Sequence, residues 1–166
     1  MALLRQFAST NGDGTGTVTG ASDSSSVAVE LAVTPAARVE YRISQLVLLI
    51  EDNAALVGDA FGGATMTNGI RIQVKQDTTV LKNIDAGVPI RRIADLWALG
   101  GRQVGDPTQA AAGTNKYAIV VLDFPDPIIL NGNTPSRLAV TFNDNLSGLV
   151  LIKVLALGIS RGQPAA

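Results

Sequence analysis

The sequence predicts an all-β fold: an antiparallel, jelly-roll-like β-sandwich, or a related fold, with one short helix and long loops. Short segments in which apolar and polar residues alternate recur along the chain. They are separated by turn-forming residues, including 17 glycines and 7 prolines. Only one segment has helical spacing. The 166 residues suffice for one domain with a buried core, and no regular repeat indicates a propeller or β-helix.

The first predicted strands follow a small, polar stretch. Residues 27–33 carry valine or leucine at every second position, and Pro35 ends this run. Residues 39–51 alternate at first and become continuously apolar at 46–50. A strand covered on both faces would explain this pattern, as would a β-bulge near residues 44–45.

The central segments predict a hairpin and a helix. Residues 53–67 are expected to form a loop, and residues 70–75 a half-buried strand with a short partner at 78–81. Residues 91–99 fit one face of a short helix, formed by Ile93, Leu96, Trp97 and Leu99. Its neighbours lead us to expect Trp97 in the core.

Strands return after a predicted loop at 100–115. Residues 117–123 form an Ile- and Val-rich segment that Phe-Pro-Asp-Pro at 124–127 is expected to close. A segment at 128–130 leads into a turn at 131–133, and strands follow around Leu138, Val140 and Phe142 and at 149–159. The total expected is seven or eight strands.

These segments divide the chain into a flexible N-terminal arm (1–26), one β-sandwich domain (27–160) and a C-terminal tail (161–166). Leu3, Leu4 and Phe7 form an apolar tip on the arm. One hypothesis is that this tip docks in a groove of a neighbouring subunit, with the polar stretch as tether. The alternative is a first strand of the chain's own sheet.

Composition excludes several functional classes. The chain has no His and no Cys, so it cannot form a Ser-His-Asp triad, a His-ligated zinc site or a disulfide. Thirteen basic residues against 14 acidic ones, with no dense basic run, argue against nucleic-acid binding. No apolar segment is long enough for a membrane span or signal peptide, so we expect synthesis in a cytosol.

The low charge indicates burial of surface against other subunits. Only 16% of the residues are charged, compared with about 25% in typical globular domains. Such a surface fits a homo-oligomer. The alternative is a monomer whose surface is rich in Thr, Ser, Asn and Gly.

Candidate chemistry is sparse. The segment 11–16 resembles a calcium loop, but its twelfth position is Ser22 instead of the closing glutamate, so we expect no metal. A glycosidase would need two flanking carboxylates, and few aromatic residues are available to bind a sugar. We expect no catalysis and no cofactor. The carboxylates considered are Glu51, Asp52, Asp59, Asp123, Asp126 and Asp144.

Three ordered segments carry a family resemblance: Thr67-Asn68-Gly69-Ile70, Asp85-Ala86-Gly87-Val88-Pro89-Ile90, and Asn143-Asp144-Asn145-Leu146-Ser147-Gly148-Leu149. In this order and spacing the chain resembles small virion proteins of tailed bacteriophages, among them capsid cement (decoration) proteins, over roughly residues 39–159. The resemblance implies a jelly-roll-like domain, usually a homotrimer, that binds the major capsid protein on the outside of the head and stabilises the expanded shell. It implies neither catalysis nor a cofactor.

Two other functions remain open. A neck or tail adaptor, or a spike base, would reuse the same domain in six- or twelve-fold rings. A receptor- or carbohydrate-binding module on the virion would need an exposed aromatic platform, for which the chain offers Trp97, two tyrosines and four phenylalanines.

Overall fold

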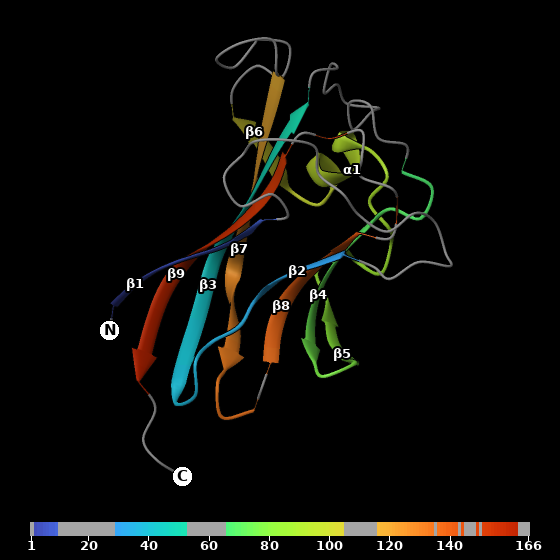
Figure 1. Ribbon diagram of the computed structural model, residues 1–166. Helices are drawn as coiled ribbons and strands as arrows, with labels where there is room; N and C mark the ends of the chain where they lie inside the picture. Colours follow the sequence, from blue (N-terminus) through green and yellow to red (C-terminus); the bar gives the residue numbers. More distant parts are fainter. Residues whose placement is uncertain are drawn as a thin grey trace.

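The computed structural model describes residues 2–9, 29–52, 66–104, 116–134, 136–142, 144, 149 and 151–162. Two antiparallel sheets pack face to face in these ranges, which confirms the predicted β-sandwich (Figure 1). The elements are β1 (Ala2–Ser9), β2 (Val29–Val33), β3 (Val39–Asp52), β4 (Ile70–Gln76), β5 (Thr79–Asn83), α1 (Ile93–Ala98), β6 (Gly101–Val104), β7 (Lys116–Asn131), β8 (Ser136–Phe142) and β9 (Leu151–Gly162).

The strands pair in the nested order of a jelly roll. β4 and β5 form the innermost hairpin, and the pairs β3–β7, β2–β8 and β1–β9 enclose it in turn. Additional β3–β9 and β4–β8 pairs join these ribbons into sheet A, with the order β1-β9-β3-β7-β6, and sheet B, with the order β2-β8-β4-β5. The short strand β6 extends sheet A beside β7.

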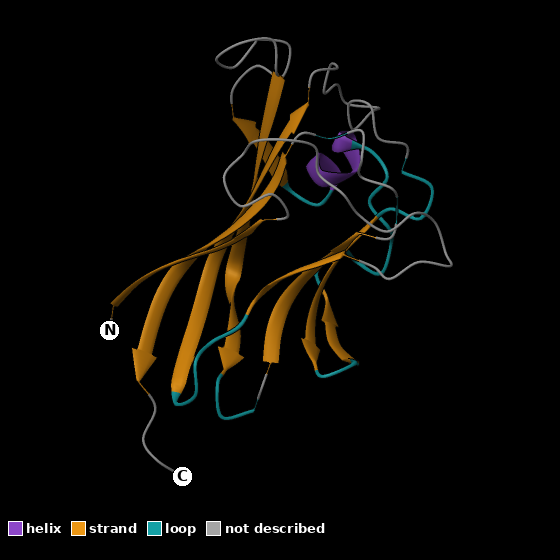
Figure 2. Cartoon of the chain, viewed as in Figure 1, coloured by secondary structure: helices purple, strands orange, loops and turns teal. Residues whose placement is uncertain are grey.

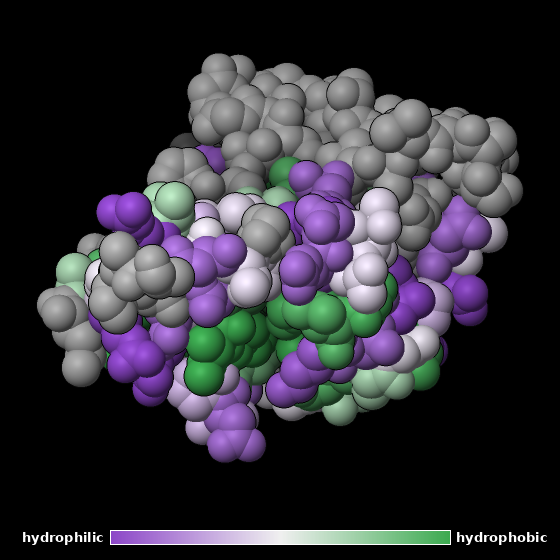
Figure 3. All heavy atoms as spheres, turned by 90° about the horizontal axis from the view of Figure 1, so that it is seen from below, coloured by the Kyte–Doolittle hydropathy of each residue, from purple (hydrophilic) through white to green (hydrophobic). Residues whose placement is uncertain are grey.

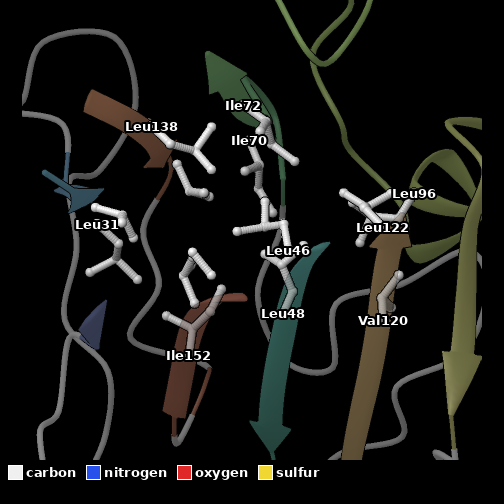
Figure 4. Packing of buried hydrophobic residues seen from close by; sticks show 14 of the residues in the cluster. Leu31, Leu46, Leu48, Ile70, Ile72, Leu96, Val120, Leu122, Leu138 and Ile152 are labelled. Atoms are coloured by element: carbon white, nitrogen blue, oxygen red, sulfur yellow. The ribbon is translucent and has the colours of Figure 1, made fainter. Parts of the chain in front are cut away.

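The core lies between the sheets and follows the alternation of the strands. Leu46, Leu48 and Ile152 of sheet A face Ile72 and Leu138 of sheet B (Figure 4). All five side chains are fully buried, and burial of each contributes on the order of 1.5–3 kcal/mol. In the view from below, hydrophobic residues lie in the middle of the molecule's surface with hydrophilic ones around them (Figure 3).

A β-bulge in β3 resolves the ambiguity of its sequence. The register shifts between Ile43 and Gln45 against both β7 and β9, and Ser44 is the extra residue against β9. On the β7 side the shift faces residues 124–127, and β7 continues through them to Asn131. The prediction that this proline-containing segment closes the strand is therefore wrong, although pairing with β3 is interrupted there.

Helix α1 forms within the predicted segment, at the upper end of the sandwich (Figure 2). The Asp95 carboxylate accepts hydrogen bonds from the backbone N–H groups of Arg91 and Arg92, each at 2.9 Å, and so caps the first turn. Ile93 and Leu96 are buried, whereas Trp97 is 41% exposed. The prediction that Trp97 is a core residue is wrong, because the short helix turns only one narrow stripe inward.

The chain ends also differ from the prediction. Residues 2–9 are a strand of the chain's own sheet, paired with β9 over their whole length, and not a flexible arm. The rest of the predicted arm, residues 10–26, lies outside the described residues. β9 runs to Gly162, so the predicted tail at 161–166 begins inside a strand. β6 occupies part of the predicted loop at 100–115, and the described residues hold nine strands.

Candidate functional site

The segments that carry the family resemblance meet at one corner of the fold, at the start of β4. The buried Asp144 carboxylate accepts three consecutive backbone N–H groups, from Thr67 at 2.9 Å, Asn68 at 2.8 Å and Gly69 at 2.6 Å. Residues separated by more than seventy positions in the chain are thereby joined through one side chain. We call this arrangement the Asp144 corner.

The second segment joins the same corner through Asp85. This fully buried carboxylate accepts hydrogen bonds from Arg71 Nε at 2.6 Å and from the backbone N–H groups of Ile72 at 3.0 Å and Gly87 at 2.9 Å. It therefore fixes the turn that begins at residue 85 against β4. With a guanidinium and backbone donors around it, the Asp85 carboxylate is an anchor of the fold.

Close backbone contact completes the corner. Ile70 and Ile90 exchange backbone hydrogen bonds at 2.8 and 2.9 Å. Gly69 has φ +84°, and a Cβ there would lie 2.7 Å from the Ile90 carbonyl oxygen and 3.0 Å from the Pro89 Cβ. The corner thus brings together Thr67, Asn68, Gly69, Asp85, Gly87, Pro89 and Asp144. Asn143, Leu146, Ser147 and Gly148 lie outside the described residues.

The remaining candidate carboxylates of the described ranges are distributed over β3 and β7, with Glu51 and Asp52 at the end of β3. Asp123 accepts hydrogen bonds from Gln45 and Arg102, and Asp126 is exposed. Both lie within β7, not at the strand end and turn that the sequence predicts. Among the described residues no three acidic side chains gather in a way that would hold a metal ion. Asp59 and the calcium-like segment at 11–16 lie outside the described residues.

The proposed docking tip is divided by the strand geometry. Leu4 is 3% exposed and belongs to the core, so it is not available to a neighbour, whereas Leu3 is 69% exposed. Phe7 is opposite Leu155 in the register, and its side chain lies outside the described residues. The alternatives for these residues were docking on a neighbouring subunit and a first strand of the chain's own sheet, and in the structure they form that strand.

The outer face of sheet B is polar and held by ion pairs. Glu30 of β2 contacts Lys75 of β4 at 2.9 Å and Arg137 of β8 at 2.6 Å. Burial alone would raise the pKa of Glu30, but hydrogen bonds from Arg137 and Lys75 outweigh it and hold that pKa below its ordinary value. The three strands are thus linked by charge on the side facing away from the core.

The outer face of sheet A has the opposite character. Val47 and Leu49 of β3, Ile119 of β7 and Leu155 of β9 line a shallow groove of about 340 Å³. Lys153 is the fifth lining residue and makes no hydrogen bond or ion pair with the described residues. We call these five residues the sheet A groove. They alternate with the core residues of the same strands, so the groove faces away from sheet B.

A second depression lies further along the same sheet. Leu3, Leu157 and Ile159 line it together with polar residues of β3. At its border Glu40 binds Arg42 and Arg161, each at 2.8 Å. Hydrogen bonds from Arg161 and Arg42 hold the pKa of Glu40 below its ordinary value. An apolar centre with a charged border is the usual composition of a protein–protein interface.

The sequence contained a signal for this surface that the prediction did not use. The continuous apolar run at 46–50 indicated either two covered faces or a bulge. The bulge is present, and the residues of the run that point away from the core are left on the outer face. The run therefore marked the groove as well as the core.

No protein-family model, no curated protein and no solved structure matches the chain. In the described ranges, the helical structure is too short to cross a bilayer, since α1 spans only Ile93–Ala98.

Proposed function

We propose that the chain is a structural protein of a tailed-bacteriophage virion, a head decoration protein that assembles as a homotrimer on the outside of the capsid. The observation that carries the proposal is the sheet A groove, an apolar surface on a chain with few charges. Jelly rolls are recurrent folds of viral structural proteins. The resemblance of the three segments to phage virion proteins adds the particular role.

Burial of the groove by neighbouring copies would supply the self-association that a trimer needs. Half-exposed aliphatic side chains on adjacent strands lose water when a second copy covers them. Lys153 is placed to meet a carboxylate of that copy. The polar outer face of sheet B, with its ion pairs already formed, is better suited to contact solvent.

The mechanism on the capsid is mechanical. Each trimer contacts several capsid subunits, so individually weak contacts add through multivalency. A protein that binds only the expanded lattice stabilises that lattice by linkage. The chain then acts as a clamp between capsomers, without any reaction.

The test compares one groove variant with one control. Leu155→Asp places a charge in the groove, whereas Val80→Asp places one on β5, where Val80 is 42% exposed. In native mass spectra we expect species built from three copies, or a multiple of three, for the wild type and Val80→Asp and the loss of these species for Leu155→Asp, with both variants folded by circular dichroism. If Leu155→Asp assembled like the wild type, the sheet A groove would not be the contact between copies, and the proposal would lose the observation that carries it.

Head binding is measured separately. Heads of the phage that encodes the chain, produced without it, are mixed with wild type or variant and sedimented. We expect the wild type and Val80→Asp to co-sediment with expanded heads and Leu155→Asp to bind much less. Failure of the wild type to bind heads would contradict the decoration role whatever its oligomeric state.

A receptor- or carbohydrate-binding module is the second candidate, because Trp97 is exposed. An exposed indole can stack on a sugar ring. Burial of Trp97 in the core, which the sequence predicted, would have prevented such stacking. Titration with glycans of the host surface, followed by calorimetry for the wild type and Trp97→Ala, tests this candidate. A saturable heat of binding that Trp97→Ala abolishes would favour it over the decoration role.

A further inference from the structure

The edge of sheet A formed by β1 differs from the other sheet edges. β1 pairs with β9 in an unbroken register from Ala2 to Ser9. No described strand pairs with its other edge. An open edge presents backbone donors and acceptors that can pair with another strand.

The three other edge strands carry protective features. β5 has a register shift against β4 and carries Lys82. β6 has only four residues, and β2 has five and is followed by Pro35. Bulges, lysines, prolines and short length are the usual means by which proteins prevent edge pairing. β1 has eight residues and neither a bulge nor a proline, and its one charged residue is Arg5.

We propose that β1 pairs antiparallel with β1 of a second copy of this chain, so that the two A sheets become one continuous sheet. The occupant is a second copy because a two-fold axis through β1 uses one edge for both partners and closes the contact. A contact between β1 and β6 would leave half of β1 unpaired, since β6 is only four residues long.

The sequence of β1 selects the register. In an antiparallel pair, residues directly opposite each other point to the same face of the sheet. A two-fold axis perpendicular to the sheet therefore keeps the core-facing sides of the two copies on the same side only when it passes through a residue, which then lies opposite its own copy. An axis at Arg5 would set arginine opposite arginine. An axis at Gln6 places residues 3–9 of one copy opposite residues 9–3 of the other and avoids this repulsion. We therefore expect the axis at Gln6.

This contact is separate from the sheet A groove and holds or fails independently of the proposed function. A two-fold contact through β1 alone gives dimers. Combined with a three-fold contact it closes as a hexamer with both kinds of axis. A trimer without an even-numbered species would refute the β1 contact and leave the decoration role intact.

Cysteine trapping provides the sharper test, because the chain has no native cysteine. In an antiparallel pair, only the residue at the axis lies opposite its own copy, at a Cα separation of about 4.5–5.5 Å that suits a disulfide. Single variants Arg5→Cys, Gln6→Cys and Phe7→Cys are oxidised mildly, with Thr79→Cys on β5 as control. Native mass spectrometry of the cysteine-free chain accompanies the experiment.

We expect nearly complete cross-linking at Gln6→Cys, little at the two neighbours, and none above background at Thr79→Cys. Even-numbered species of the cysteine-free chain are expected alongside. Equal cross-linking at all four positions would indicate random collision and overturn the proposal. A cysteine-free chain that shows no even-numbered species would overturn it as well. A head-to-tail ring of six copies would also be an even-numbered species. It never places Gln6 opposite Gln6 of another copy, so it would give no specific cross-link at Gln6→Cys.

Discussion

Replacement of Asp144 is the most direct perturbation of the corner that joins the resemblance segments. Asp144→Ala removes the acceptor for three backbone N–H groups. The Gly69 donor is buried, and its loss of a partner costs about 2 kcal/mol. The donors of Thr67 and Asn68 are partly buried, and each costs about 1 kcal/mol.

The sum is a loss of about 4 kcal/mol in the free energy of unfolding. For a domain of this size it corresponds to a decrease of about 10 °C in melting temperature. Asp144→Asn keeps one acceptor oxygen but sets an amide donor against a backbone N–H, so we expect about half the loss. The free energies are measured by urea denaturation, which also shows through its slope whether the native state stays compact.

Asp126→Ala is the matched control, because Asp126 is an exposed aspartate in β7. We expect it to change the free energy of unfolding by less than about 0.5 kcal/mol. If Asp144→Ala were as mild as Asp126→Ala, the carboxylate would not hold the corner.

Three further predictions concern other parts of the fold. Gly69→Ala should cost about 3 kcal/mol and Gly87→Ala about 1 kcal/mol in urea denaturation, because both have positive φ but only a Cβ at Gly69 meets backbone atoms; equal costs would contradict the close approach to Ile90. Glu30→Gln should lower stability at neutral pH by about 1–2 kcal/mol. The charged Glu30 stabilises the fold above its ordinary pKa of 4.5, and this contribution is lost as pH falls through the lower folded-state pKa. The variant should therefore show a shallower loss of stability below pH 4.5, and an unchanged profile would contradict the ion-pair assignment. Trp97 is the sole tryptophan and is exposed, so its fluorescence should be red-shifted and readily quenched by acrylamide in the folded chain; a blue-shifted, protected emission would contradict its position.

The sequence was sufficient for the fold class and most strands, because those depend on local alternation. Ile70, Ile72 and Val74 alternate with polar residues, and they are all buried in β4 as expected. The same holds for Leu138, Val140 and Phe142 in β8. Even the change of phase in β3 was visible, and a bulge was one of the two predicted explanations.

Other features depended on contacts that local pattern does not encode. β6 is stabilised by pairing with β7, and its own four residues, Gly-Arg-Gln-Val, show no clear alternation. The N-terminal residues form a strand because β9 offers an edge for them. Trp97 lies outward because α1 is too short for a second inward stripe.

In the candidate sites, too, some features could be predicted from local sequence and others depend on contacts between distant residues. The residues of the Asp144 corner were singled out as ordered motifs, and the sequence alone did not show that they meet. Their role in the structure is to fix loops to β4. The sheet A groove is assembled from three strands that are distant in sequence. The apolar run at 46–50 marks only its β3 part, and the pairing of β3 with β7 and β9 brings in the rest.

The proposed decoration role is tested most directly by the copy number of the chain on purified phage heads. Heads of the encoding phage are separated from tails, and the chain is quantified by peptide mass spectrometry relative to the major capsid protein. We expect many copies on expanded heads, in a fixed ratio to the capsid protein and accessible to protease from outside. Absence from heads, or a few copies that fractionate with tails, would contradict the decoration role.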